Sequence, residues 1–375
     1  MFLYIIYLFF LLSVIAFSPT RYFSFSLIAL ISSIPGIAYC LIKKPSKIQT
    51  CLFLLFGVTF FAGINNIIQL EEFGRKLSTY ELISSSSLWL ISYVVMKLAL
   101  DDKKLEKWGF SYKYFLVFFL LGVYVMIGEL IGVAAMDEGS NSVYYILPVL
   151  PCIMFYSKNK YYALILTFVL IIFSIKRSAF LIVVASILWL LFCAYKGIIQ
   201  LNKKSMRAII GIAVVMIGVL IFGGAYIDAI ISRFTGISED GGSHRDLIWE
   251  YAIGLFVGSD DMHQIWGNGP RYFWFSSSDI SAAHNDFLEI LVSCGIVGEI
   301  LFVWLHIILI RMLVKLVKAR SEMAIVFGIC YFTFFIWNLI ACQFAYQSQA
   351  VCTCMCWAIM EHYINKHETN SLYSH

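Results

Sequence analysis

The chain contains a succession of apolar runs, each about as long as a helix that crosses a membrane. A spanning helix needs about 20 mostly apolar residues. On that basis we predict twelve spans, at approximately residues 1–17, 22–42, 48–69, 82–100, 114–135, 143–157, 160–175, 178–195, 208–231, 286–310, 322–342 and 345–363. Only 13% of the residues are charged, against roughly 25% in soluble domains. The predicted fold class is therefore all-α, a polytopic integral membrane protein.

The positive charges predict how these spans are oriented. Cytoplasmic loops carry an excess of Lys and Arg. If the N-terminus is cytoplasmic, nineteen Lys and Arg residues fall in inside loops and eight in outside loops. We therefore place both termini in the cytoplasm and predict four segments: nine spans in 1–231, an extracytoplasmic loop with an amphipathic helix in 232–284, three spans in 285–363 and a tail in 364–375.

Net charge and cysteine placement exclude two other classes of protein. The net charge is only +4 and no basic run is interleaved with exposed aromatic residues, so we expect no nucleic-acid partner. All ten cysteines fall in or at the edge of apolar spans. That placement argues against a disulfide framework.

The only long polar interruption runs from Ser238 to Gly298. Near its start, Ser243-His-Arg-Asp246 has capping-box spacing. The apolar residues that follow have helical spacing, which predicts an amphipathic helix on the membrane surface; they are Leu247, Ile248, Tyr251, Ala252, Leu255 and Phe256. Arg245 would then lie at a helix N-terminus that favours anions. The alternative is an Arg that only extends toward lipid headgroups.

A histidine motif ends this polar stretch. Asp286 and Glu289 have capping-box spacing and predict the start of the tenth span. His284 comes just before that helix N-terminus, and an imidazole there suits a general base near neutral pH. The alternative is an interfacial histidine that caps or packs. Upstream, Gly267-Asn-Gly269-Pro270 predicts a tight turn and lacks the strand and Lys of a phosphate loop.

The cations predicted to face outward are unusual in type. Six of the eight are Arg, whose planar fork of donors matches phosphate or carboxylate oxygens. Arg177 stands between two apolar spans with little polar sequence around it, so it should face a partner or a cavity. We predict a similar anion-facing position for Arg271, and Glu129 is an intramembrane carboxylate that could line the same site. A chance excess of Arg is the alternative.

At these residues the sequence resembles the bacterial O-antigen ligase and the O-antigen or capsule polymerase superfamily. The resemblance covers residues 174–300, and the first five spans match only in general character. It rests on His284-Asn285-x-x-Leu288, Gly295-Ile-Val-Gly298, Gly267-x-Gly269, Arg245 with Trp249, and Arg177-Ser178.

The resemblance implies a metal-independent, inverting glycosyl transfer without a cofactor, on a glycosyltransferase C-like membrane fold in the bacterial inner membrane. The donor would be an oligosaccharide on undecaprenyl pyrophosphate, which enters from the membrane lipid. Arg177 and Arg245 would hold the pyrophosphate and His284 would activate the acceptor hydroxyl. We assign substrate binding to the remaining candidates, which are Arg271, Gly267, Gly269, Asn285 and Glu129.

Two further readings stay open at this point. A ligase would transfer the glycan to lipid A core, whereas a polymerase extends another lipid-linked repeat. The aromatic, cysteine-containing and divergent character of the chain favours the polymerase. A polysaccharide flippase would also explain the spans, but the sequence has no repeated halves and few charges in mid-span. A chain-length regulator and a separate flippase of the same pathway are the expected protein partners.

Overall fold

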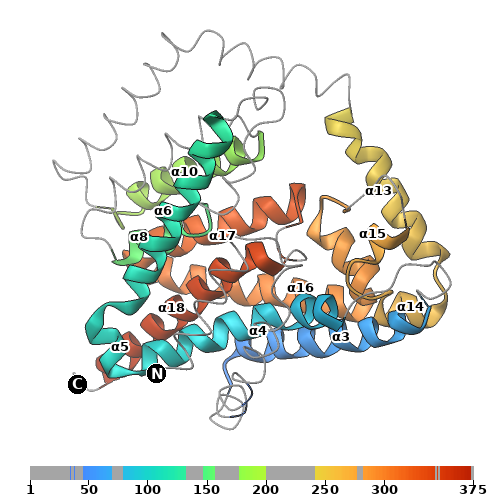
Figure 1. Ribbon diagram of the computed structural model, residues 1–375. Coiled ribbons are helices and arrows are strands. Elements are labelled where there is room, and N and C mark those ends of the chain that lie inside the picture. Colours follow the sequence, from blue (N-terminus) through green and yellow to red (C-terminus); the bar gives the residue numbers. More distant parts are fainter. Residues whose placement is uncertain are drawn as a thin grey trace. The chain divides into compact units, whose positions relative to one another are not determined.

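The computed structural model describes residues 34, 38, 45–69, 79–131, 147–156, 177–199, 241–276, 282–342, 344 and 347–372 (Figure 1). Within these residues every regular element is a helix, which confirms the predicted all-α class. The helices are α3 Lys47–Gln69, α4 Thr79–Asp101, α5 Lys103–Trp108, α6 Phe110–Ile131, α8 Leu150–Tyr156, α10 Arg177–Tyr195, α13 Gly241–Gly258, α14 Asp261–Trp266, α15 Tyr272–Ser276, α16 Asp286–Lys318, α17 Met323–Ile340 and α18 Gln347–Leu372.

Three helices of the described part are long and apolar enough to cross a membrane. They are the Lys47–Ile64 stretch of α3, together with α16 and α17. Shorter apolar stretches lie at Tyr112–Tyr124 and Leu181–Tyr195. These five coincide with predicted spans, and the chain is a membrane protein. The predicted count of twelve is not confirmed. The spans at 1–17, 160–175 and 208–231 lie outside the described residues, and α4 and α18, at the predicted spans 82–100 and 345–363, are not among the helices apolar enough to cross.

Two compact units can be distinguished along the chain. The first comprises Met1–Ser111, Arg245–Ile310 and Trp337–His375, and the second comprises Tyr112–His244 and Arg311–Ile336. In the second unit, the Trp189 indole of α10 donates to the Ala324 carbonyl (3.0 Å) and packs where Gly328 leaves room. Arg177 is the first residue of this α10 helix.

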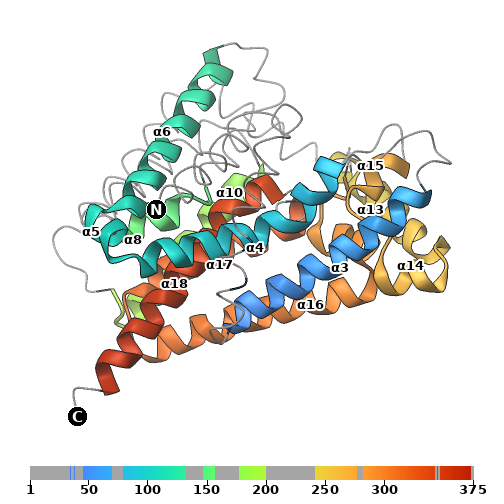
Figure 2. The same cartoon turned by 60° about the horizontal axis from the view of Figure 1, so that its bottom comes forward.

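The first unit is built around α4, which lies against α3 and α18 (Figure 2). Tyr93 of α4 contacts Ser46 Oγ (3.0 Å) and donates to the Glu361 carboxylate of α18. Lys97 pairs with the same carboxylate at 3.7 Å. Tyr93, Lys97 and Glu361 are therefore partnered with one another, as the low dielectric between helices favours. The nine cysteines that the structure describes are all free and buried.

Phe344 joins helices α4 and α16 of this unit. Its ring stacks on Trp89 of α4 with centroids 4.3 Å apart, and its carbonyl accepts the Trp89 indole N–H at 2.7 Å. Its own N–H donates to the carboxylate of Asp286 at 2.8 Å. Asp286 is the first residue of α16 and is fully buried. This contact fixes the start of α16, immediately after the predicted catalytic histidine.

A break within α16 receives the predicted glycine turn. Gly295 has non-helical dihedrals (φ 66°, ψ −170°), so the preceding carbonyls do not meet the N–H groups four residues later. Instead the carbonyls of Val292 and Ser293 accept the N–H groups of Asn268 (3.0 Å) and Gly269 (2.9 Å). The turn thus docks on α16 through backbone hydrogen bonds.

The approach of the two backbones leaves no room for side chains at this contact. A Cβ on Gly267 would lie 2.2 Å from the Ser293 carbonyl oxygen, and a Cβ on Gly295 would lie 2.4 Å from that of Ile265. Gly267 also has φ +91°, where other residues are strained. These glycines are therefore required by the fold.

We expect Gly295→Ala to destabilise the protein. The backbone conformation alone costs a residue with a side chain about 1–3 kcal/mol, and the contact with the Ile265 carbonyl adds to that. Thermal unfolding in detergent should show a lowered Tm. Gly57→Ala in α3 is the matched control, because a Cβ there meets no atom within 4 Å. An equal Tm for the two variants would contradict the docking described above.

Candidate functional site

Asn285 caps α16. Its Oδ1 accepts the N–H groups of Phe287 (2.9 Å) and Leu288 (3.3 Å), as an N-cap side chain does. The sequence predicted Asp286 at this position, and that prediction is wrong. The Asp286 carboxylate is buried on the Phe344 N–H, so the neighbouring amide takes the capping role. Glu289 reaches back to the N–H of Ala283 at 2.9 Å.

His284 lies between Asn285, which caps α16, and Ala283, whose backbone N–H and carbonyl are both hydrogen-bonded. The N–H of Ala283 binds Glu289, and its carbonyl accepts the indole N–H of Trp249 at 3.1 Å. His284 itself has a left-handed backbone (φ 50°), a conformation in which His is enriched. Its side chain is solvent-accessible. The chain thus presents the imidazole at the surface from a fixed backbone.

Helix α13 packs against the segment that contains His284. Its predicted apolar face packs on a small core formed by Ala252, Phe273, Ala283 and Val292. Ile248, Tyr251, Leu255 and Phe256 lie against that core, whereas Leu247 is exposed. The helix is confirmed, but it begins at Gly241 and not at Ser243. Part of its apolar face therefore covers protein, whereas Leu247, Ile253 and Val257 are exposed. Its placement on the membrane surface stays a prediction.

Arg245 and His284 are brought within electrostatic reach of each other. Arg245 precedes Trp249 by one helical turn, so both project from the same side of α13, and the Trp249 indole is bound next to His284. Although the His284 side chain is solvent-accessible, the protein around it partly desolvates the imidazole, which lowers its pKa below the ordinary 6.5, and the charge of Arg245 lowers it further. The imidazole is therefore neutral near pH 7 and able to accept a proton.

The other predicted site residues have varied positions. Gly267 and Gly269 are buried in the turn that docks on α16, and Asn285 is the cap of that helix. Arg271 follows the turn with φ 62° and is half-buried. Three of these four residues thus have a structural task, whatever they contact in a substrate.

Arg177 and Glu129 belong to the second unit. Arg177 begins α10, and Glu129 lies in the last turn of α6. Both side chains lie outside the part of the structure that is described. Their roles on the substrate stay predictions from the sequence.

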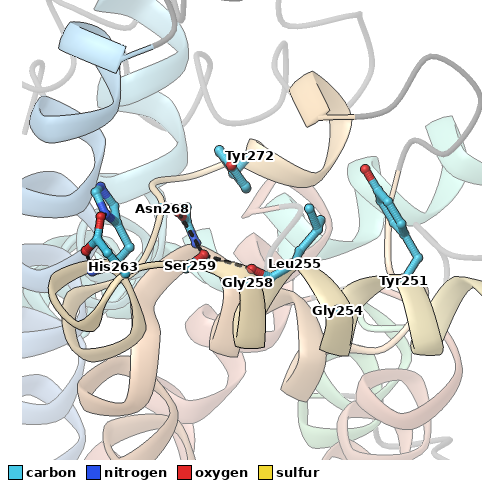
Figure 3. A pocket seen from close by; sticks show the side chains of 9 residues that line it. Tyr251, Gly254, Leu255, Gly258, Ser259, His263, Asn268 and Tyr272 are labelled. Carbon is cyan, nitrogen blue, oxygen red and sulfur yellow. Dashed lines mark hydrogen bonds and ion pairs between the residues drawn. The ribbon is translucent and has the colours of Figure 1, made fainter.

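A cavity of about 510 Å³ lies beside α13 (Figure 3). It is lined by Tyr251, Gly254, Leu255, Gly258, Ser259, Asp260, His263, Asn268 and Tyr272. The sequence predicted Tyr251 and Leu255 as part of an amphipathic helix, but it assigned none of the nine to a substrate site. One signal was available, since Asp260 and His263 have the spacing of an N-cap and the third residue of a helix.

The Asp260 and His263 pair orients a second imidazole at this cavity. Asp260 caps α14, with Oδ1 accepting the His263 N–H (3.0 Å) and Oδ2 lying 2.7 Å from His263 Nδ1. The hydrogen bond from the His263 backbone, then that from its side chain, lowers the pKa of Asp260. The carboxylate therefore holds Nδ1, which leaves Nε2 as the ring nitrogen that can meet a ligand.

The region that contains this site matches a known protein family. Residues 162–303 match the Wzy_C family model, which is described as O-antigen ligase. The match supports the resemblance of this region to the O-antigen polymerase and ligase superfamily. Members of the Wzy_C family are glycosyltransferase-like enzymes. No curated protein matches the chain. The Wzy_C region includes Arg245, His284, the glycine turn and the cavity.

We expect the pKa of His284 to lie below 6.5 and to rise when Arg245 is replaced by Gln. A nearby cation opposes protonation of the imidazole, so its removal favours the imidazolium. NMR titration of protein labelled at histidine would measure both values. Arg271→Gln is the matched control, because burial and Arg245 account for the lowered pKa. An unchanged pKa in Arg245→Gln would separate the two residues.

Proposed function

We propose that this protein is a bacterial inner-membrane glycosyltransferase that joins undecaprenyl-pyrophosphate-linked oligosaccharide repeats on the periplasmic face. It would act as an O-antigen or capsular polysaccharide polymerase. The observation that carries the proposal is the pairing of Arg245 with His284 inside the Wzy_C region. A neutral imidazole and a guanidinium at one exposed position supply a base and an anion site.

In the proposed reaction, His284 takes the proton of the acceptor sugar hydroxyl. The hydroxyl oxygen forms a bond to the anomeric carbon of the donor as the bond from that carbon to the pyrophosphate oxygen breaks. Attack from the opposite side inverts the anomeric configuration. The mechanism uses no metal and no cofactor, and the undecaprenyl pyrophosphate leaves as an anion.

Arg245 has two effects in this scheme. Before the reaction, its charge helps to keep His284 neutral and so competent as a base. As the leaving group gains negative charge, the guanidinium stabilises it. That negative charge also offsets the repulsion between Arg245 and the newly protonated imidazole, so proton transfer and departure of the pyrophosphate favour each other.

A second candidate function is ligation of the glycan to lipid A core. The description of the matching family model, O-antigen ligase, favours it. Arg245 and His284 would have the same roles, and only the acceptor would differ. The two functions predict different surface polysaccharides when the site is inactivated.

We expect cells whose only copy carries His284→Ala to lose the polysaccharide ladder on a gel. Collapse to a single repeat on core would identify a polymerase, and loss of both long and single-repeat glycan would identify a ligase. His362→Ala is the control and should keep the ladder, because this α18 histidine pairs with Asp101 of α4, away from the site. With expression verified, an unchanged ladder in His284→Ala would refute the assignment of His284.

We expect Arg245→Lys to slow transfer by about 10- to 100-fold, because a lysine keeps the charge but loses the fork of donors. Rates would be measured with purified protein and lipid-linked repeat units. The pKa of His284 should stay low in this variant, which separates the donor geometry from the charge. Arg311→Lys, at an exposed position of α16, is the control. A wild-type rate in Arg245→Lys would remove Arg245 from the site.

A further inference from the structure

The cavity beside α13 is separate from the Arg245 and His284 pair. Gly254 lies nine residues after Arg245 on the same helix, which is about 14 Å along its axis. The volume of about 510 Å³ falls within the range of roughly 300–1,000 Å³ that is usual for small-molecule sites. A single sugar ring bound at Gly254 could therefore not also place its hydroxyl group at His284.

One wall of the cavity is apolar and rigid. Gly254 and Gly258 are one helical turn apart, so α13 exposes its backbone there. The Tyr251 ring packs edge-on against Phe273 at 5.4 Å, and its hydroxyl donates to the Ser276 carbonyl at 2.9 Å. The ring is thus fixed before any ligand binds, which lowers the entropy that binding costs.

The cavity also contains a small set of hydrogen-bonding groups. Ser259 Oγ and the Asn268 amide lie 3.1–3.3 Å apart and hold each other in place. Asn268 is anchored to α16 by its bond to the Val292 carbonyl at 3.2 Å. His263 is oriented by Asp260, as described above. Figure 3 shows Ser259 and Asn268 between His263 and Leu255.

The charge of the lining distinguishes this cavity from an anion site. None of its nine described lining residues is Lys or Arg, and Asp260 contributes a carboxylate. A pyrophosphate would be repelled by this carboxylate, and a hydrocarbon chain would cover the polar atoms of Ser259, Asp260 and Asn268 without hydrogen-bonding to them. A neutral polyhydroxylated ring satisfies both sets of groups, because it has apolar C–H faces and hydroxyl groups around its edge.

We propose that this cavity binds one sugar unit of the glycan, at a distance from the glycosidic bond that forms. The identity of the glycan as the substrate rests on the proposed function, whereas binding does not require transfer. The cavity, which has no cation among its described lining residues, would hold the saccharide while Arg245 near His284 holds the charged end. Binding energy obtained away from the reacting bond would then select the correct repeat unit.

The test is binding of free saccharide to the purified full-length protein. The probe is the single repeat unit released from the polysaccharide of wild-type cells, followed by saturation-transfer NMR and titration calorimetry. Gly254→Leu fills the cavity, and a Cβ at that position meets no atom within 4 Å. Gly57→Leu makes the same change at an equally open helical glycine of α3. We expect at least a tenfold loss of affinity in Gly254→Leu and wild-type affinity in Gly57→Leu.

Wild-type affinity in Gly254→Leu, or no binding by the wild-type protein, would overturn the proposal. If Gly254→Leu fails to fold, Gly258→Leu fills the same cavity, and its Cβ also meets open space. His284→Ala distinguishes this proposal from the proposed function. It should bind the saccharide normally but not transfer it. If His284→Ala transfers normally while Gly254→Leu loses binding, the sugar site stands and the catalytic assignment falls.

Discussion

The arrangement of the candidate site depends on one backbone contact within the first unit. Gly295 interrupts α16, and the freed carbonyls of Val292 and Ser293 bind the N–H groups of the glycine turn. In an apolar environment such carbonyls need a donor, and here the polar loop supplies it. The contact also explains the glycines on both sides, because neither backbone can approach the other past a side chain.

Several features follow from that docking. The turn brings Asn268 onto α16, where its side chain meets Ser259 at the end of α13 and closes one side of the cavity. Helix α13 then covers the start of α16, and its Trp249 binds the residue before His284. Phe344, which comes much later in the chain, binds the same helix start through the hydrogen bond from its N–H to Asp286. The histidine is therefore placed by contacts that converge from distant parts of the chain.

The two halves of the loop offer different chemistry. Near His284 there is a neutral imidazole whose pKa is lowered by burial and by Arg245. Along α13 there is a cavity with tyrosine rings, bare helix backbone and a carboxylate. An acceptor or donor that is charged at one end and neutral along its length matches this division. A lipid-linked oligosaccharide has that character, which links the proposed transfer to the proposed sugar site.

The sequence by itself determined the membrane class, the first helix of the polar loop and the two residues that meet in the site. Apolar run length and helical spacing are local properties, so they can be read without a fold. Only the tertiary structure decided that Asn285 and not Asp286 caps α16. The Asp286 carboxylate instead accepts the N–H of Phe344, a residue far along the chain. It likewise decided that part of the apolar face of α13 covers protein and that a cavity forms beside it. Such outcomes depend on which distant groups compete for the same donor or surface, and no local pattern records that competition.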